Sequence, residues 1–321
     1  MQEDWGTRSD RWAGIRSEMV QVRGTAVHTL RAGEDRGGVP QLLVHGLGGS
    51  ATNWLEVMGA LAQRGPVLAP DLPGFGRTEP PRETATHVRA NARFLLALLD
   101  EVGWTDRVQI HGNSMGGLLS VLVASAAPHQ VDRLVLVSPG LTMSRGAIRQ
   151  IHPATVARLL PFALPGVGAQ LIKRAHGKMT PQQLFDDLGH YIHSDPTRVS
   201  PELAAVGLEN VEYGRTQDWR LPGFTAAAES TVRTLASRRR VERAVQDVQA
   251  PTLVVWGDQD RLVGRAVIDR IQDLQPDWQV AILEDVGHAA MMEVPDRYLQ
   301  TVEPWLDATS ELPTVDEVAP T

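Results

Sequence analysis

A serine placed between two glycines is the most informative feature of this 321-residue sequence. Ser114 lies in the run Gly112-Asn113-Ser114-Met115-Gly116, between a short apolar segment typical of a strand and an apolar segment typical of a helix. Such a turn raises the serine hydroxyl above the edge of a sheet, where the unpaired N–H groups of the following helix begin. The spacing therefore predicts that Ser114 is a nucleophile, because only glycine fits two residues before and two residues after it.

A serine hydroxyl needs a base to accept its proton and an acid to orient that base. Among ten histidines, His288 follows the last expected strand and lies at the carboxyl edge where ligand sites of parallel sheets gather. His45 also follows a strand, but it opens a glycine-rich loop. Asp258 and Asp260 both follow the strand before His288. We expect Asp260 to orient His288, and Asp258 to shape the turn through an Asx-type hydrogen bond.

Attack by the serine creates an oxyanion, which needs two N–H donors, and losing one typically costs ~3 kcal/mol. The N–H of Met115 at the start of the helix is the first candidate. The second is the N–H of Leu47, in the loop His45-Gly46-Leu47-Gly48-Gly49 that follows an earlier strand. Residues expected to support this loop and the serine turn are His45, Gly46, Gly48 and Asn113.

Another group of polar residues suggests a metal site at first sight. His190 and His193 lie near Asp186 and Asp187. An amphipathic helix explains this spacing better, because no third suitably spaced ligand stands out. We therefore expect neither a metal nor an organic cofactor.

Composition narrows the class of protein further. The formal net charge is −7, which argues against a nucleic-acid or anionic-membrane partner. The absence of cysteine excludes disulfides and cysteine nucleophiles. No apolar run has the length of a signal peptide or a transmembrane helix, so we expect a cytoplasmic protein without stable membrane insertion. The oligomeric state does not follow from these features.

The elements that must position these residues alternate regularly between strand and helix. Alternation of this kind predicts a doubly wound, mostly parallel α/β sheet. An N-terminal hairpin around Gly24 is expected from segments 19–22 and 26–30. The other expected strands are 41–44, 66–69, 107–110, 133–137, 252–256 and 278–283, and the expected helices are 50–63, 84–102, a segment ending near 127, and 295–308.

The alternation lapses between Gly140 and Thr252. A crossover between parallel strands needs only ~12 residues, and a helix over 229–248 can supply it. The remainder, roughly 141–225, is rich in proline and glycine and is predicted to be an insertion of helices.

Together these motifs resemble the α/β-hydrolase superfamily, over residues 19 to 306. The matching segments are 45–49, 71–76, 112–117, 257–260 and 287–288. The resemblance implies an eight-stranded sheet with a helical cap after the sixth strand, and it supports Asp260 as the acid. It also implies that segment 71–76 is structural. The resulting division is a core over 1–142, a cap over 143–226 and a second part of the core over 227–321.

Within this superfamily, serine at the nucleophile position separates the chain from the dehalogenase and epoxide-hydrolase branches, which carry aspartate there. The segment 112–117 is similar to the serine turn of carbon–carbon bond hydrolases that act on meta-cleavage products. Those enzymes usually place tryptophan after the catalytic histidine, whereas this chain has Ala289. The segment 289–295 instead resembles esterases and monoacylglycerol-type lipases.

We therefore predict hydrolysis of a carboxylic ester, with a small hydrophobic ester or an apolar acyl ester as substrate. The alternatives are carbon–carbon bond hydrolysis, thioesterase or acyltransferase activity, and a non-catalytic ligand-binding protein on the same fold. Apolar residues of the insertion are candidates to roof an acyl pocket, or only to pack the cap onto the core. They are Leu159, Leu160, Phe162, Leu164, Val167, Leu171 and Ile172.

Overall fold

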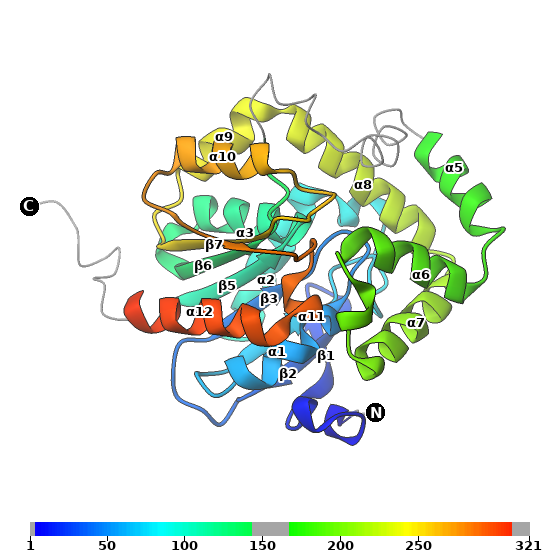
Figure 1. Ribbon diagram of the computed structural model, residues 1–321, viewed down its shortest axis with the longest axis horizontal. Coiled ribbons are helices and arrows are strands. Elements are labelled where there is room, and N and C mark those ends of the chain that lie inside the picture. Colours follow the sequence, from blue (N-terminus) through cyan, green and yellow to red (C-terminus); the bar gives the residue numbers. More distant parts are fainter. Residues whose placement is uncertain (1–3, 143–166, 310–321) are drawn as a thin grey trace, which may run out of the picture.

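The computed structural model describes residues 4–142 and 167–309 (Figure 1). Eight strands of this part of the chain form one sheet in the order β1-β2-β4-β3-β5-β6-β7-β8. β1 pairs antiparallel with β2, and β2 with β4, whereas all other neighbours are parallel. The prediction of an eight-stranded, mostly parallel sheet is therefore confirmed. The strands are β1 Arg16–Val22, β2 Thr25–Ala32, β3 Gln41–Val44, β4 Val67–Pro70, β5 Val108–Asn113, β6 Val131–Val137, β7 Thr252–Gly257 and β8 Gln279–Leu283.

Helices cover both faces of this sheet, which is why its central strands can be apolar throughout. Every residue of β3, β4 and β7 is buried. One hydrophobic core joins the sheet to α2, α3, α9 and α10, and a second core joins it to α1, α11 and α12. Figure 1 shows α12 on one side of the sheet and α9 and α10 on the other. The bounds are α1 Leu55–Leu61, α2 Val88–Glu101, α3 Met115–Ala126, α9 Arg238–Gln246, α10 Arg265–Leu274, α11 Ala290–Glu293 and α12 Pro295–Thr309.

The insertion predicted after the sixth strand is present and helical. Its described helices are α5 Val167–His176, α6 Pro181–Ile192, α7 Pro201–Arg215 and α8 Arg220–Ala236. In Figure 1, α5, α6 and α7 lie together to the right of the sheet, and α8 runs over its upper edge. The boundary predicted between residues 226 and 227 falls inside α8, and the three-part division of the chain stays a prediction.

Three of the predicted helices differ from the observed ones. The helix expected over 84–102 consists of the 3-10 helix η4 Glu83–Thr86 and α2, which begins only at Val88. The helix expected over 50–63 begins as the 3-10 turn η3 Ala51–Trp54, with Ser50 and Asn53 forming a capping box. The single helix expected over 229–248 consists of α8 and α9, separated at Ser237. There the Ser237 hydroxyl donates to the Arg233 carbonyl, a local side-chain hydrogen bond that competes with helix continuation.

Most of the apolar residues proposed to roof a pocket lie outside the described residues, including Leu159, Leu160, Phe162 and Leu164. The side chain of Val167 is not described either. Leu171 is 46% exposed, so at least this residue faces solvent. No helix of the described residues combines the length and the apolar character needed to cross a bilayer.

Candidate active site

Ser114 forms a turn of one residue, tighter than the sequence suggested. β5 continues to Asn113 and α3 begins at Met115. Ser114 has φ +55° and ψ −114°, a strained backbone conformation for a residue with a side chain. Its N–H donates to the Val137 carbonyl at 3.0 Å, and its own carbonyl accepts from the N–H of Gly140 at 2.9 Å. The loop after β6 therefore holds the strained turn in place.

The glycines on either side of Ser114 are required by close backbone approach. A Cβ at Gly112 would lie 2.4 Å from the Ser120 Oγ and 2.5 Å from the Gly116 carbonyl oxygen. A Cβ at Gly116 would lie 2.2 Å from the Val44 carbonyl oxygen in β3. The expectation that only glycine fits at both positions is confirmed.

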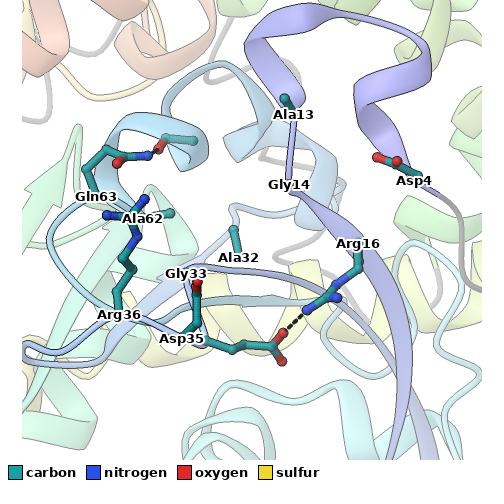
Figure 2. A pocket seen from close by; sticks show the side chains of 12 residues that line it. Asp4, Ala13, Gly14, Arg16, Ala32, Gly33, Asp35, Arg36, Ala62 and Gln63 are labelled. Carbon is teal, nitrogen blue, oxygen red and sulfur yellow. Dashed lines mark hydrogen bonds and ion pairs between the residues drawn. The ribbon is translucent and has the colours of Figure 1, made fainter.

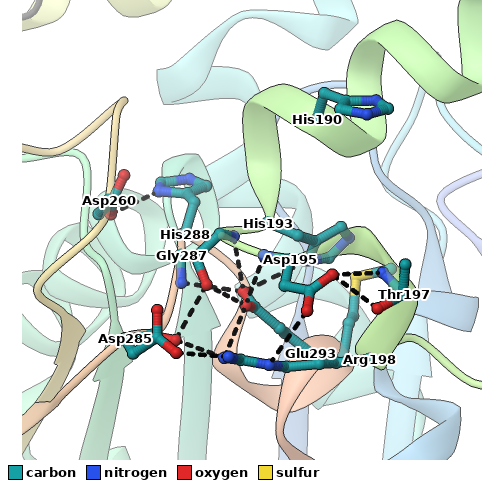
Figure 3. A network of polar contacts seen from close by, with 12 residues as sticks. His190, His193, Asp195, Thr197, Arg198, Asp260, Asp285, Gly287, His288 and Glu293 are labelled. Atoms are coloured by element: carbon teal, nitrogen blue, oxygen red, sulfur yellow. Dashed lines mark hydrogen bonds and ion pairs between the residues drawn. The ribbon is translucent and has the colours of Figure 1, made fainter.

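His288 and Asp260 are in direct contact (Figure 3). The His288 Nδ1 lies 2.8 Å from Asp260 Oδ2, and both residues are buried. The other oxygen, Asp260 Oδ1, accepts the N–H groups of Leu262 at 2.8 Å and Val263 at 3.0 Å. The loop after β7 thus fixes the carboxylate, and the carboxylate fixes the imidazole.

Asp258 has a different role from the one predicted for it. Its Oδ1 accepts the N–H of Asp285 at 2.7 Å, which connects the loop after β7 to the loop after β8. The Asx-type hydrogen bond expected at Asp258 is formed by Asp260 instead, through the N–H of Leu262. Asp258 therefore stabilises the pairing of two loops, and the structure brings Asp260 to His288.

Asn113 connects the serine turn to the histidine loop. Its buried Nδ2 donates to the carbonyl oxygens of Val137 at 3.2 Å and His288 at 3.1 Å. The residue before Ser114 is therefore hydrogen-bonded to the backbone of His288. This contact brings the candidate nucleophile and the candidate base to the same edge of the sheet.

The loop after β3 packs directly on the serine turn. A Cβ at Gly46 would lie 3.1 Å from the Ser114 Cβ and 3.1 Å from Asn113 Oδ1. Gly48 has φ +81°, a conformation that favours glycine. Among the described residues, the hydrogen bonds include no acceptor for the N–H groups of Leu47 and Met115. Leu47 follows Gly46, which contacts Ser114, and Met115 follows Ser114 directly; an oxyanion requires two N–H donors of this kind.

His45 supports this loop as a neutral imidazole. Its Nδ1 lies 2.8 Å from the Gly46 carbonyl oxygen, and its Nε2 accepts the N–H of Leu72 at 3.0 Å. One nitrogen must therefore carry a proton and the other must not. Complete burial lowers the pKa of His45 to about 4, which agrees with this arrangement.

Asp71 has the structural role that the resemblance implied for its segment. Its carboxylate accepts the N–H of Ala51 at 2.7 Å and the N–H of Arg77 at 2.8 Å, and it lies 2.7 Å from His28 Nδ1. Burial disfavours the charged carboxylate, but the contact with His28, the nearby His45 and the hydrogen bond from Ala51 together outweigh it, so the pKa of Asp71 is lowered. This buried carboxylate therefore connects β2, through His28, to the segments that follow β3 and β4, through Ala51 and Arg77.

The insertion reaches the loop after β3 through α8. A Cβ at Gly48 would lie 3.2 Å from Cε2 of Phe224, so the aromatic ring rests on this glycine. One turn earlier, the Arg220 guanidinium lies 5.8 Å from the centre of the Phe75 ring, and its Nη1 donates to the Gly76 carbonyl at 3.3 Å. Nothing in the sequence distinguishes Phe224 or Arg220, because their partners lie in distant segments.

The histidines and aspartates in and directly after α6, which suggested a metal site at first sight, do not form one among the described residues. In the described part of the chain, no three acidic, histidine or cysteine side chains are arranged to hold a metal ion. His190 Nδ1 lies 2.7 Å from the Asp186 carbonyl oxygen, an ordinary contact within α6. A polar hollow lies beside β1 and β2, lined by Asp4, Arg16, Asp35, Arg36 and Gln63 among others, and none of the predicted site residues lines it (Figure 2).

Glu293 is a buried acidic residue near the site whose contacts could not be predicted from the sequence. It lies five residues after His288, and only 1% of it is exposed. Its carboxylate accepts hydrogen bonds from Gly287 and from residues 194 and 195 of the insertion. The signal in the sequence was a single acidic residue in the otherwise apolar run 289–295.

Comparison with known proteins agrees with this architecture. The family described as "alpha/beta hydrolase fold" matches residues 40–295. Lipase 1 of Psychrobacter immobilis is 28% identical over 261 residues, covering 81% of this chain and 74% of that protein. The 2-hydroxy-6-oxo-2,4-heptadienoate hydrolase of Pseudomonas putida is 29% identical over 292 residues, covering 88% of this chain and 93% of that enzyme.

Solved structures show the same fold. The crystal structure of a putative lipase from Acinetobacter baumannii superposes with a TM-score of 0.76 at 23% identity, covering 95% of this chain and 96% of that one. The family match covers most of the chain, and the serine turn and the eight-stranded sheet agree with it. The chain belongs to the alpha/beta hydrolase fold family.

Proposed function

We propose that this protein is a serine hydrolase that cleaves a carboxylic ester, with Ser114, His288 and Asp260 as its catalytic residues. The observation that carries the proposal is the connection among the three. His288 Nδ1 lies 2.8 Å from Asp260, and the His288 carbonyl accepts a hydrogen bond from Asn113, the residue before Ser114. A base held by an acid beside a strained serine is the arrangement that activates a hydroxyl.

The proposed reaction follows the two-step acyl-enzyme route. Because Nδ1 of His288 faces Asp260, its Nε2 is the nitrogen that accepts the proton as the Ser114 Oγ attacks the ester carbonyl. The N–H groups of Leu47 and Met115 stabilise the oxyanion. His288 then gives the proton to the leaving alcohol, and water releases the acid by the same steps in the second half. Asp260 stays ionised and keeps the imidazole in the required tautomer.

The ester is favoured over a carbon–carbon bond by the residue after His288. Ala289 occupies the position where carbon–carbon hydrolases of this superfamily usually carry tryptophan, and it is buried. Similarity to a lipase at 28% identity supports a hydrophobic ester as the substrate class. The second candidate is hydrolysis of a vinylogous 1,5-diketone, because the heptadienoate hydrolase is equally distant at 29% identity and matches this chain over 93% of its own length.

The role of Ser114 is tested by labelling with a fluorophosphonate. We expect the wild-type protein to be labelled and Ser114→Ala to remain unlabelled, whereas Ser237→Ala, at the junction of α8 and α9, is labelled as wild type. Absence of labelling in the folded wild-type protein would contradict a nucleophilic serine.

The substrate class is tested separately. p-Nitrophenyl esters of graded acyl length are assayed beside a vinylogous 1,5-diketone. We expect turnover of the esters that is abolished by Ser114→Ala. Rapid cleavage of the diketone without turnover of any ester would refute the ester and favour the second candidate.

A further inference from the structure

The carboxylate of Glu293 joins two segments that are distant in the sequence (Figure 3). Its Oε2 accepts the N–H of Gly287 at 2.9 Å and the N–H of Ser194 at 3.1 Å. Its Oε1 accepts the N–H of Asp195 at 3.1 Å and lies 2.5 Å from the Ser194 Oγ. Gly287 precedes His288, and residues 194 and 195 belong to the insertion, between α6 and α7.

Direct backbone contacts accompany this carboxylate. The N–H of His288 donates to the Ile192 carbonyl, the last residue of α6, at 2.7 Å. A Cβ at Gly287 would lie 2.5 Å from the Ile192 carbonyl oxygen and 2.6 Å from the Ser194 nitrogen. The backbone of the insertion is therefore packed against the loop that presents His288, with no space between them.

A third contact lies at the start of the same loop. Asp285 has φ +57°, an unusual conformation for a residue with a side chain. Arg198 of the insertion donates to its carbonyl at 2.5 Å and pairs with its carboxylate. The Arg198 guanidinium also lies 3.6 Å from Glu293 Oε1. The insertion thus contacts the His288 loop at Asp285, at Gly287 and at His288 itself.

The carboxylate of Glu293 suits this arrangement because backbone N–H groups face both of its oxygens: those of Gly287 and Ser194 face Oε2, and that of Asp195 faces Oε1. In an amide, one of these oxygens is replaced by an NH2 group, so at least one backbone N–H loses its acceptor and faces another donor. We infer that Glu293 is a positioning residue whose carboxylate fixes the His288 loop against residues 194 and 195, so that the alignment of His288 with Asp260 depends on how the insertion is docked.

This inference rests on the proposed function, since His288 is taken as the base. It goes beyond that function because it makes the insertion part of what positions the base. Asp260 restrains the imidazole from the side of the loop after β7, at 2.8 Å. Glu293 holds the preceding residue, Gly287, against residues 194 and 195 of the insertion. Releasing this restraint loosens the loop that carries His288, so that the imidazole shifts relative to Asp260 and Ser114.

The test compares Glu293→Gln and Glu293→Asp with a matched control, Glu303→Gln on α12. Three quantities are measured: kcat and KM on the p-nitrophenyl ester that wild type cleaves best, the rate of fluorophosphonate labelling, and the downfield proton NMR signal of the His288 Nδ1–H. For Glu293→Gln we expect kcat and the labelling rate to fall by about tenfold to a hundredfold with KM nearly unchanged, as for a misplaced catalytic group. We expect the Nδ1–H signal to broaden or shift, and Glu293→Asp, which keeps the charge, to recover part of the loss.

A purely structural role makes a different prediction. If Glu293→Gln melts at a lower temperature but keeps the wild-type kcat and the wild-type Nδ1–H signal, the inference is overturned. Should Glu293→Gln fail to fold, Ser194→Ala removes one partner of Oε1 and retains the carboxylate. We expect it to lower kcat to a smaller extent and to shift the same signal, and an unchanged signal and kcat would overturn the inference as well.

The NMR signal also separates this inference from the proposed function. A wild-type protein that neither labels nor hydrolyses contradicts the proposed function, whereas the dependence of the Nδ1–H signal on Glu293 is observed without any substrate.

Discussion

Replacing Glu293 by glutamine changes the dependence of stability on pH in a way that the structure specifies. Burial by itself raises the pKa of this carboxyl group, but the neighbouring His193 and the hydrogen bonds from Ser194, Gly287 and Asp195 outweigh it. Together they lower the pKa of Glu293 to about 2. The ionisable groups around it include Arg198, 3.6 Å from Oε1, His193, whose Nδ1 lies 3.8 Å from Oε2, and Asp195.

The size of the effect follows from linkage between protonation and folding. A carboxyl group whose pKa falls from 4.5 to about 2 on folding contributes about 3 kcal/mol to the free energy of unfolding at neutral pH. Because the folded-state pKa is the lower one, this contribution is fully present above the unfolded-state pKa and is lost as the pH falls toward 2. At about pH 3.5 it has decreased to about 2 kcal/mol.

The assay is urea unfolding of wild type and Glu293→Gln at several values between about pH 7 and about pH 3.5. The amide also leaves donors unpaired, which lowers the stability of the variant by the same amount at every pH. We therefore expect a difference of about 3 kcal/mol or more at neutral pH that narrows by about 1 kcal/mol at the acidic end. A difference that stays constant over this range would refute the reasoning, because the carboxylate would then gain nothing from being ionised in the folded protein.

Three further predictions concern the site itself. We expect Asp260→Asn to lower kcat by about 10⁴-fold, whereas Asp258→Asn, on the same loop, leaves steady-state kcat unchanged; equal losses would contradict the assignment of the acid. Gly116→Ala places a Cβ 2.2 Å from a carbonyl oxygen of β3. We therefore expect this variant to lose about 3 kcal/mol of stability and to lose fluorophosphonate labelling. Gly37→Ala is the control, because the space around its Cβ is open, and we expect it to behave as wild type. The pKa of His45 is lowered to about 4, so its imidazole NMR signals should not change between about pH 5.5 and about pH 8; titration in that range would exclude the neutral, doubly hydrogen-bonded ring.

Much of the fold could be predicted because the sequence patterns that indicate strands and helices are local. Short apolar runs bounded by glycine, proline and aspartate marked the parallel strands, and the alternation with helices indicated the sheet. The position of Ser114 followed from its glycine neighbours, whose Cβ atoms the backbone cannot accommodate. The division of the long helix at Ser237 was missed, because a single serine that bonds back to its own helix gives only a weak signal in the sequence.

Residues whose partners are distant in the sequence could not be assigned in the same way. Asp258 was expected to bond locally, but its acceptor oxygen binds the N–H of Asp285, which only the pairing of β7 with β8 brings near. Glu293 and Ser194 are 99 residues apart, and no periodicity connects them. A lone carboxylate in the apolar run 289–295 is the kind of exception that marks a buried polar contact, since burying an unpaired charge is costly.

The insertion contacts, at two separate points, the two loops that take part in the proposed reaction. On one side, the Phe224 ring of α8 rests on Gly48, in the loop that offers the N–H of Leu47 to the oxyanion. On the other side, the Ile192 carbonyl accepts the N–H of His288, and Glu293 fixes the residue before it. The proposed oxyanion donor and the proposed base therefore both belong to loops that contact the same inserted segment, although these loops are far apart in the sequence. Under the proposed function, a change in how the insertion is docked would act on both groups at once, which is more than a cover over the substrate would do.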